Sequence, residues 1–101
     1  SAMQEDHVSM GWSAARKLRR SVDGLTRVLA IELLTAARGI ELRAPILPSP
    51  ATGAVIAALR ETTHGPGPDR VLSPEIEAAV QFVSAGRVRA AVEPIVGPLA
   101  P

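Results

Sequence analysis

The sequence has no cysteine and no tyrosine, and its only aromatic residues are Trp12 and Phe82. Without cysteine the chain forms no disulfide and carries out no thiolate chemistry. Ala, Leu and Val supply most of an apolar content of 47%. This composition favours closely packed helices over a sheet, because strands prefer aromatic and β-branched side chains. The composition therefore predicts an all-α fold.

The sequence also lacks an excess of either charge and any long hydrophobic run. Eleven Lys and Arg face ten Asp and Glu, giving a net charge of +1, so the total charge does not indicate a nucleic-acid partner or an anionic membrane. No run approaches the ~18 apolar residues of a membrane helix, and the first fifteen residues do not resemble a signal peptide. We expect at most one domain, without nucleic acid or membrane as partner, and a cytoplasmic location.

A long amphipathic helix is predicted in the first part of the chain. Apolar residues recur at steps of three and four, which is the spacing of one helical face: Ala15, Leu18, Val22, Leu25, Leu29 and Leu33. Asp6 is a suitable N-cap, and Gly39, directly after Arg38, is suited to end the helix. The pattern predicts a helix over about residues 6–38.

This helix is too long for the rest of the chain to cover. At ~1.5 Å per residue it spans roughly 50 Å, whereas a compact domain of this length has a radius of gyration near ~13 Å. Either the helix bends, at Gly11 or Gly24, or other polypeptide covers its apolar surface. We expect the helix to be part of a larger helical bundle, and the isolated chain to self-associate along the apolar stripe.

The remainder of the chain is predicted to be shorter and broken by proline. Residues 39–50 form a proline-rich connector, and residues 51–101 form short helices and a tail. Three short helices are expected over about residues 51–60, 73–85 and 87–93. Ser49 and Ser73 each precede a proline and are predicted N-caps, and Pro94 is expected to follow the end of the last helix.

Polar chemistry is concentrated in Gln4-Glu5-Asp6-His7-Val8-Ser9-Met10-Gly11, at the entrance of the long helix. A carboxylate there, such as that of Glu5, can act as a general base or bind an N–H group of a substrate. The plain alternative is that the helix dipole favours acidic residues at this position. No metal site is predicted, because the adjacent Asp6 and His7 point in different directions on a helix.

The basic residues on the long helix allow a second kind of site. Arg16, Lys17, Arg19 and Arg20 follow one another closely and are able to contact phosphates. No aromatic residues alternate with them, and no nucleic-acid fold signature accompanies them. We interpret this run as a solvated face or as a surface for ion pairs between subunits.

The octet at residues 4–11, followed by a long helix rich in Arg and Ala, resembles the histidine ammonia-lyases. The similarity continues through Ile31–Arg38, the Arg-Ala-Pro connector, the Ala-Thr-Gly helix and the Asp69-Arg70 pair before Ser-Pro-Glu. The resemblance implies that residues 1–101 form a single C-terminal helical segment of such an enzyme.

In that family an electrophilic methylidene-imidazolone, formed from an Ala-Ser-Gly tripeptide, activates the substrate for loss of ammonia. The resemblance implies that Glu5 contacts the substrate imidazole or transfers a proton, and that Gln4 binds substrate in the same pocket. The phenylalanine and tyrosine branches usually have Asn-Gln at this pair, so Gln4-Glu5 favours the conversion of L-histidine to trans-urocanate and ammonia. Family members form homotetramers, which implies that the partners are the rest of the enzyme chain and its sister subunits.

The sequence departs from the family pattern in two respects. It contains no Ala-Ser-Gly tripeptide and no tyrosine, whereas the family uses both. We therefore expect no cofactor within this chain and no lyase activity from the chain alone. The alternative hypothesis is a non-enzymatic, all-α oligomerisation or partner-docking module, in which the octet only caps the helix.

Overall fold

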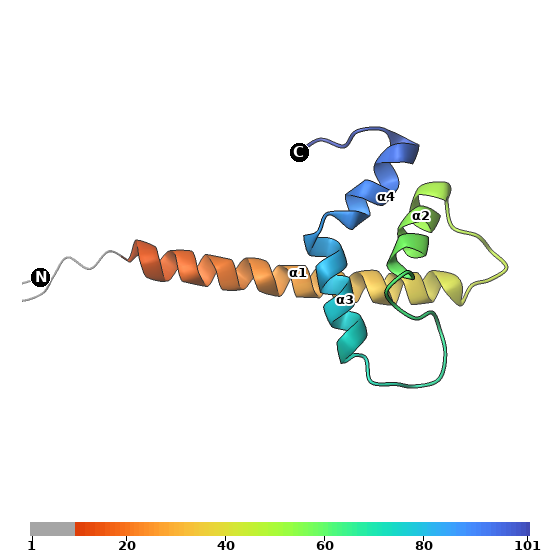
Figure 1. Ribbon diagram of the computed structural model, residues 1–101, viewed down its shortest axis with the longest axis horizontal. Helices are drawn as coiled ribbons and strands as arrows, with labels where there is room; N and C mark the ends of the chain where they lie inside the picture. Colours follow the sequence, from red (N-terminus) through yellow and green to blue (C-terminus); the bar gives the residue numbers. More distant parts are fainter. Residues whose placement is uncertain (1–9) are drawn as a thin grey trace, which may run out of the picture.

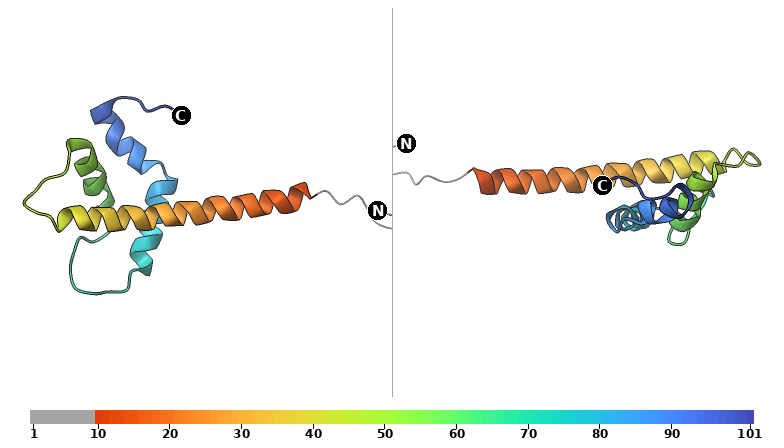
Figure 2. Two further views of the ribbon diagram at one scale, coloured as in Figure 1. Left: turned by 180° about the vertical axis from the view of Figure 1, so that it is seen from behind. Right: turned by 90° about the horizontal axis from the view of Figure 1, so that it is seen from above.

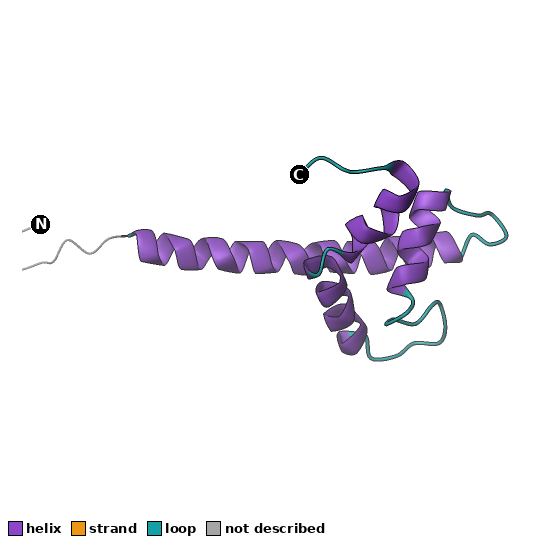
Figure 3. Ribbon diagram, turned by 45° about the horizontal axis from the view of Figure 1, so that its top comes forward, coloured by secondary structure: helices purple, strands orange, loops and turns teal. Residues whose placement is uncertain are grey.

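The computed structural model describes residues 10–101, and over that range the chain is all-α, with four helices and no strand (Figures 1 and 3). The helices are α1 (Gly11–Glu41), α2 (Pro50–Leu59), α3 (Ser73–Ser84) and α4 (Arg87–Val96). One long helix and three shorter ones confirm the predicted fold class. No helix in this range is both long and apolar enough to cross a membrane.

Helix α1 is unbroken over 31 residues, which corresponds to about 46 Å at ~1.5 Å per residue. It continues through Gly24 without interruption, so the bend considered there is absent. A glycine within a helix costs stability but keeps the backbone hydrogen bonds of its neighbours. The part of α1 that the rest of the chain cannot cover therefore projects from the core instead of folding back onto it.

The predicted end of α1 at Arg38 is wrong, because the helix continues through Gly39 to Glu41. Gly39 does not adopt the left-handed conformation of a helix-terminating glycine. A tertiary contact explains the extension, since the Glu41 carboxylate forms an ion pair with Arg60 from the second half of the chain. The connector therefore covers residues 42–49 rather than 39–50.

The two predicted serine caps have different outcomes. The Ser49 hydroxyl accepts a hydrogen bond from the Thr52 backbone N–H at 3.3 Å, as expected of an N-cap for α2. Ser73 is instead the first helical residue of α3, and the cap position is Leu72, which contributes no side-chain hydrogen bond. Leu72 takes helical dihedrals, and its carbonyl already accepts the Ile76 N–H at 2.9 Å, so the helix begins one residue early.

Helix α4 also extends beyond its predicted end at Glu93, because it includes Pro94 and runs to Val96. In the last turn the proline removes only one helical N–H donor. The Gly97 N–H still donates to the Glu93 carbonyl at 2.9 Å. Gly97 then ends the helix with a positive φ of 87°, which glycine adopts without steric cost.

The core lies against the C-terminal half of α1. Helix α3 packs against α1 and also touches α4, and α4 packs against α2 (Figure 1). The buried apolar side chains are Ala30, Ala37, Val55, Leu59, Ala79 and Phe82. Small alanines on α1 and α3 let the two helices approach closely.

The N-terminal half of α1 projects away from this core (Figure 2), and the described chain measures 71 × 37 × 18 Å. Its apolar stripe is exposed there: Leu18 by 66%, Val22 by 53%, Leu25 by 57% and Leu29 by 44%. We call these four residues the apolar seam. Because successive residues turn by ~100°, the seam lies roughly 100° around the axis from the buried Ala30 and Ala37. The prediction that the second half cannot cover α1 is confirmed.

Candidate functional site

The predicted site residues, Gln4 and Glu5, lie outside the residues that the structure describes, as do Asp6 and His7. Their proposed roles therefore remain predictions. The described chain shows the element that follows them, which is the projecting N-terminal half of α1. The octet thus precedes a long, exposed helix rather than a segment packed in the small core.

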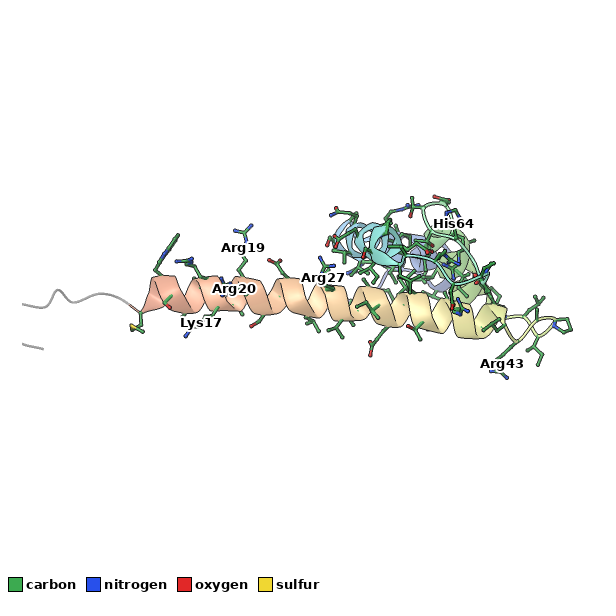
Figure 4. All side chains as sticks on the ribbon, turned by 90° about the horizontal axis from the view of Figure 1, so that it is seen from below. Lys17, Arg19, Arg20, Arg27, Arg43 and His64 are labelled. Atoms are coloured by element: carbon green, nitrogen blue, oxygen red, sulfur yellow. The ribbon has the colours of Figure 1, made fainter. Side chains whose placement is uncertain are left out.

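Basic side chains surround this half of α1. Lys17, Arg19 and Arg20 are exposed and project from the helix (Figure 4), and within residues 10–101 their charged groups have no ion-pair partner. Farther along the helix, the Arg27 guanidinium reaches Glu77 of α3 at 2.6 Å, in an exposed pair. The expectation of a solvated or subunit-facing basic surface therefore stays a prediction.

A polar network lies at the other end of α1. Arg60 donates from Nε to Glu41 Oε1 at 2.8 Å and from Nη2 to Glu41 Oε2 at 3.0 Å. Its Nη1 also donates to the Thr63 hydroxyl at 3.0 Å, and that hydroxyl donates to the Leu59 carbonyl at 2.8 Å. This network joins the ends of α1 and α2 to the loop that follows α2.

A second network fixes that loop to α3. Arg70 donates from Nε to Glu75 Oε2 at 2.6 Å and from Nη2 to Glu75 Oε1 at 3.0 Å. The His64 backbone N–H also donates to Glu75 Oε1, at 3.0 Å, and Arg70 Nη2 donates to the Gly65 carbonyl at 3.1 Å. The loop between α2 and α3 is thereby held by side chains rather than by secondary structure.

Among the described residues, Glu75 is the charged residue that is buried, with only 7% of its surface exposed. The hydrogen bond from Arg70 is the main reason that its pKa falls from 4.5 to about 2, against the opposing effect of burial. The His64 N–H lowers the pKa further. The carboxylate therefore stays ionised near neutral pH, and both of its oxygens are engaged.

A cavity of about 120 Å³ opens between the two networks. We call it the α1–α3 pocket. We call its apolar lining, from α1 and the start of α3, the floor, and its polar lining, from α1, Arg60 and the loop, the rim. The lining residues are Ile31, Leu34, Thr35, Arg38, Arg60, His64, Gly65, Pro66, Arg70, Leu72, Glu75 and Ile76.

The two carboxylates of these networks are not poised to act as general bases. Glu41 and Glu75 are each bound by an arginine through two hydrogen bonds, and the depressed pKa of Glu75 makes it a weak base. Within residues 10–101 no three His, Cys, Asp or Glu side chains group in a way that holds a metal ion. The two networks therefore hold the helices and the loop together.

These two networks were not predicted from the sequence. Glu75 lies in the first turn of α3, where the helix dipole favours an acidic residue. Arg70 appeared only as part of the family resemblance. The spacing of Glu41 and Arg60, 19 residues apart, matches no local pairing rule, because such rules cover residues three or four apart.

Comparison with known proteins identifies similar sequences. The family described as "Aromatic amino acid lyase" matches residues 1–61. Over 103 aligned residues, the chain is 63% identical to a histidine ammonia-lyase of Streptomyces griseus, covering 99% of this chain and 20% of that protein. It is 52% identical to a histidine ammonia-lyase of Symbiobacterium thermophilum, covering 98% of this chain and 20% of that protein.

A more distant relative shows the same pattern of coverage. A histidine ammonia-lyase of Shewanella oneidensis is 49% identical over 82% of this chain and 16% of its own length. The chain thus spans about a fifth of the length of the Streptomyces griseus and Symbiobacterium thermophilum enzymes. No solved structure matches it significantly.

Proposed function

The chain belongs to the aromatic amino acid lyase family, and from that membership we propose that it is the C-terminal part of a histidine ammonia-lyase. The whole enzyme would convert L-histidine to trans-urocanate and ammonia. The observation that carries this proposal is the match of almost the entire chain to proteins named histidine ammonia-lyase. The family match begins at residue 1 and so includes the octet.

In this proposal Gln4 and Glu5 belong to the active site of the whole enzyme. The Glu5 carboxylate accepts an N–H of the substrate imidazole or takes part in proton transfer, and the Gln4 amide lines the same pocket. Both residues precede the entrance of α1, which begins at Gly11 in the described chain.

The electrophile of the family does not fit the residues of this chain. Methylidene-imidazolone forms from Ala-Ser-Gly, and the chain contains neither that tripeptide nor a tyrosine. We therefore assign no step through that group to these residues. We propose that the group comes from another part of the enzyme and that the chain alone does not turn over L-histidine.

We propose that α1 also supplies a helix to the oligomer core. The seam side chains are 44% to 66% exposed in the described chain, and a large apolar patch rarely remains in contact with water. In the whole enzyme, other helices of the same chain and of sister subunits would cover the seam, as in a homotetramer. The assembled protein is expected in the cytoplasm, and the absence of cysteine suits a reducing compartment.

In the same proposal, residues 1–101 form one C-terminal helical segment. The ion pair of Glu41 with Arg60 fixes the end of α2 to the end of α1, and α3, which packs on α1, is joined to the preceding loop by the pair of Arg70 with Glu75. The N-terminal half of α1 stays free to enter a bundle. One half of α1 is thus packed against the short helices and the other half projects. This arrangement fits a helix that is shared between the C-terminal segment and a larger helical bundle.

The exposed seam also favours a second candidate function, a non-enzymatic oligomerisation or docking module. The reading frame upstream of Ser1 separates the two. An Ala-Ser-Gly tripeptide within several hundred upstream residues would support the lyase. A start codon directly before Ser1 would support the module and overturn the lyase proposal.

A further inference from the structure

The α1–α3 pocket carries chemistry that the proposed lyase role does not use. Its α1 residues start at Ile31, about 30 Å along the helix from Gly11 at ~1.5 Å per residue. The pocket is therefore remote from the helix entrance where the octet ends. All of its lining residues lie within the described range, so a ligand site there does not depend on the proposed lyase function.

The pocket rim holds one uncompensated positive charge. Three arginines line it, and two of them are each bound by a carboxylate through two hydrogen bonds: Arg60 by Glu41 and Arg70 by Glu75. The third, Arg38, is exposed, and its guanidinium has no hydrogen-bond or ion-pair partner among residues 10–101. An anion entering the pocket would therefore find a free guanidinium, which suits a carboxylate through two parallel hydrogen bonds.

The floor of the pocket is apolar. Ile31 and Leu34 contribute from α1, and Leu72 and Ile76 from the start of α3. An apolar cavity of about 150 Å³ holds benzene, so the volume of about 120 Å³ suits a ligand of about five or six non-hydrogen atoms. The floor therefore favours a ligand that carries a short apolar chain next to its anionic group.

The loop wall of the pocket is already in place. Arg70 Nη2 donates to the carbonyls of His64 and Gly65 at 3.2 and 3.1 Å, while Glu75 accepts the His64 N–H at 3.0 Å. His64 lies with this group of side chains over the C-terminal half of α1 (Figure 4). A wall that is fixed in advance lowers the entropic cost of binding. The Glu75 charge is compensated by Arg70, so it opposes an incoming anion only weakly.

We propose that the α1–α3 pocket binds a small aliphatic monocarboxylate. Its apolar chain of about three carbons lies on the floor formed by Ile31, Leu34, Leu72 and Ile76. Its carboxylate pairs with the Arg38 guanidinium at the rim. Both features are required, because the four floor side chains provide no hydrogen-bond donor for a carboxylate.

Sodium butyrate is the probe for this site, and butyramide is its uncharged counterpart of nearly the same shape. Titration of the ¹⁵N-labelled chain, followed by NMR, should show saturable shifts in the amides around Ile31–Arg38 and Leu72–Ile76. The dissociation constant is expected on the order of millimolar, which suits so small a ligand. Butyramide should bind at least about tenfold more weakly, since a charge-assisted pair is lost.

A matched pair of variants tests the role of the guanidinium. Arg38→Gln should weaken butyrate binding by about tenfold, whereas Arg20→Gln, an exposed change on the same helix and outside the pocket, should leave it unchanged. Circular dichroism of both variants verifies the fold. Equal binding by Arg38→Gln and Arg20→Gln would overturn the proposal. So would equal affinity for butyrate and butyramide, or a lack of saturable shifts with butyrate, and both of these tests use the unmodified chain.

Discussion

Arg60 binds the carboxylate of Glu41 through two hydrogen bonds, of 2.8 Å from Nε and 3.0 Å from Nη2. Glu41 is the last residue of α1, and Arg60 directly follows α2. Their side chains are only 22% and 17% exposed, so water screens this pair less than a surface pair. The pair fixes where α1 ends and how the second half of the chain returns to it.

Glu41→Gln should therefore destabilise the chain by about 1–2 kcal/mol, because it removes a charge from a partly buried two-hydrogen-bond pair. Glu61→Gln is the matched control. Glu61 pairs with Arg87 at 2.7 Å with its side chain 63% exposed, so its loss should cost no more than about 0.5 kcal/mol. Urea unfolding followed by circular dichroism measures both, and equal losses would show that burial does not strengthen the Glu41 pair.

The stability of the chain should depend on pH because of the Glu75 carboxyl group. The pKa of Glu75 in the folded chain is about 2, below its ordinary value of 4.5. A lowered folded-state pKa gives stability that is fully present above pH 4.5 and is lost as the pH falls toward 2. The unfolding free energy of the unmodified chain should therefore drop across that interval, as the bonds from Arg70 and the His64 N–H lose their anion.

Two variants isolate this effect. Glu75→Gln should be less stable at neutral pH and should show a much shallower loss between pH 4.5 and 2. Glu77→Gln is its control, because Glu77 pairs with Arg27 at an exposed position. Its pKa is also lowered, chiefly by the Arg27 hydrogen bond, but its pair is well solvated. The same acid profile in Glu75→Gln and the unmodified chain would exclude Glu75 as the source.

Features that depend on local chemistry were predictable from the sequence. The periodicity of the apolar residues identified α1, and the Ser49-Pro50 pair identified the start of α2 with its cap. The all-α fold class could be predicted because the composition and the periodicity of the apolar residues agree. In the described residues α1 begins at Gly11, with Met10 at the cap position, whereas residue 6, the predicted start, and its predicted cap Asp6 lie outside the described range.

The errors arose where a distant part of the chain decides the outcome. Gly39 resembles a helix terminator locally, but the pair of Glu41 with Arg60 holds three further residues in the helix. The error at Pro94 has a local cause instead, because a proline in the last turn of a helix removes only one hydrogen-bond donor. The α1–α3 pocket was also missed, since its walls come from α1, the loop and α3, and no spacing in the sequence indicates that they meet.

A glycine substitution tests the corrected end of α1, and a second one, at the cap residue Gly86 before α4, provides the contrast. Gly39→Ala should stabilise the chain by about 0.5–1 kcal/mol, because an added Cβ meets nothing within 4 Å and alanine favours a helix interior. Gly86→Ala should destabilise it by about 1 kcal/mol, since Gly86 has a φ of +71°. Thermal unfolding measures both shifts. Destabilisation by Gly39→Ala would return Gly39 to the role of a helix terminator.

The isolated chain should self-associate through the apolar seam, since burial of apolar surface is worth ~25 cal/mol per Å². Val22→Glu places a charge in the seam and should shift the chain toward monomer. Val71→Glu makes the same change in the loop before α3, where the valine is 79% exposed, and should leave association unchanged. Sedimentation equilibrium measures both. A folded, monomeric unmodified chain would contradict the proposed role of the seam.

The most direct test of the lyase proposal is the turnover of L-histidine by the complete enzyme carrying Glu5→Gln. We expect kcat to fall by about 100-fold or more, which is within the range of a lost proton-transfer group, while the melting temperature stays close to that of the unmodified enzyme. Glu61→Gln, the same change at a remote exposed position, should keep full activity. An unchanged rate of urocanate formation by Glu5→Gln would contradict the account.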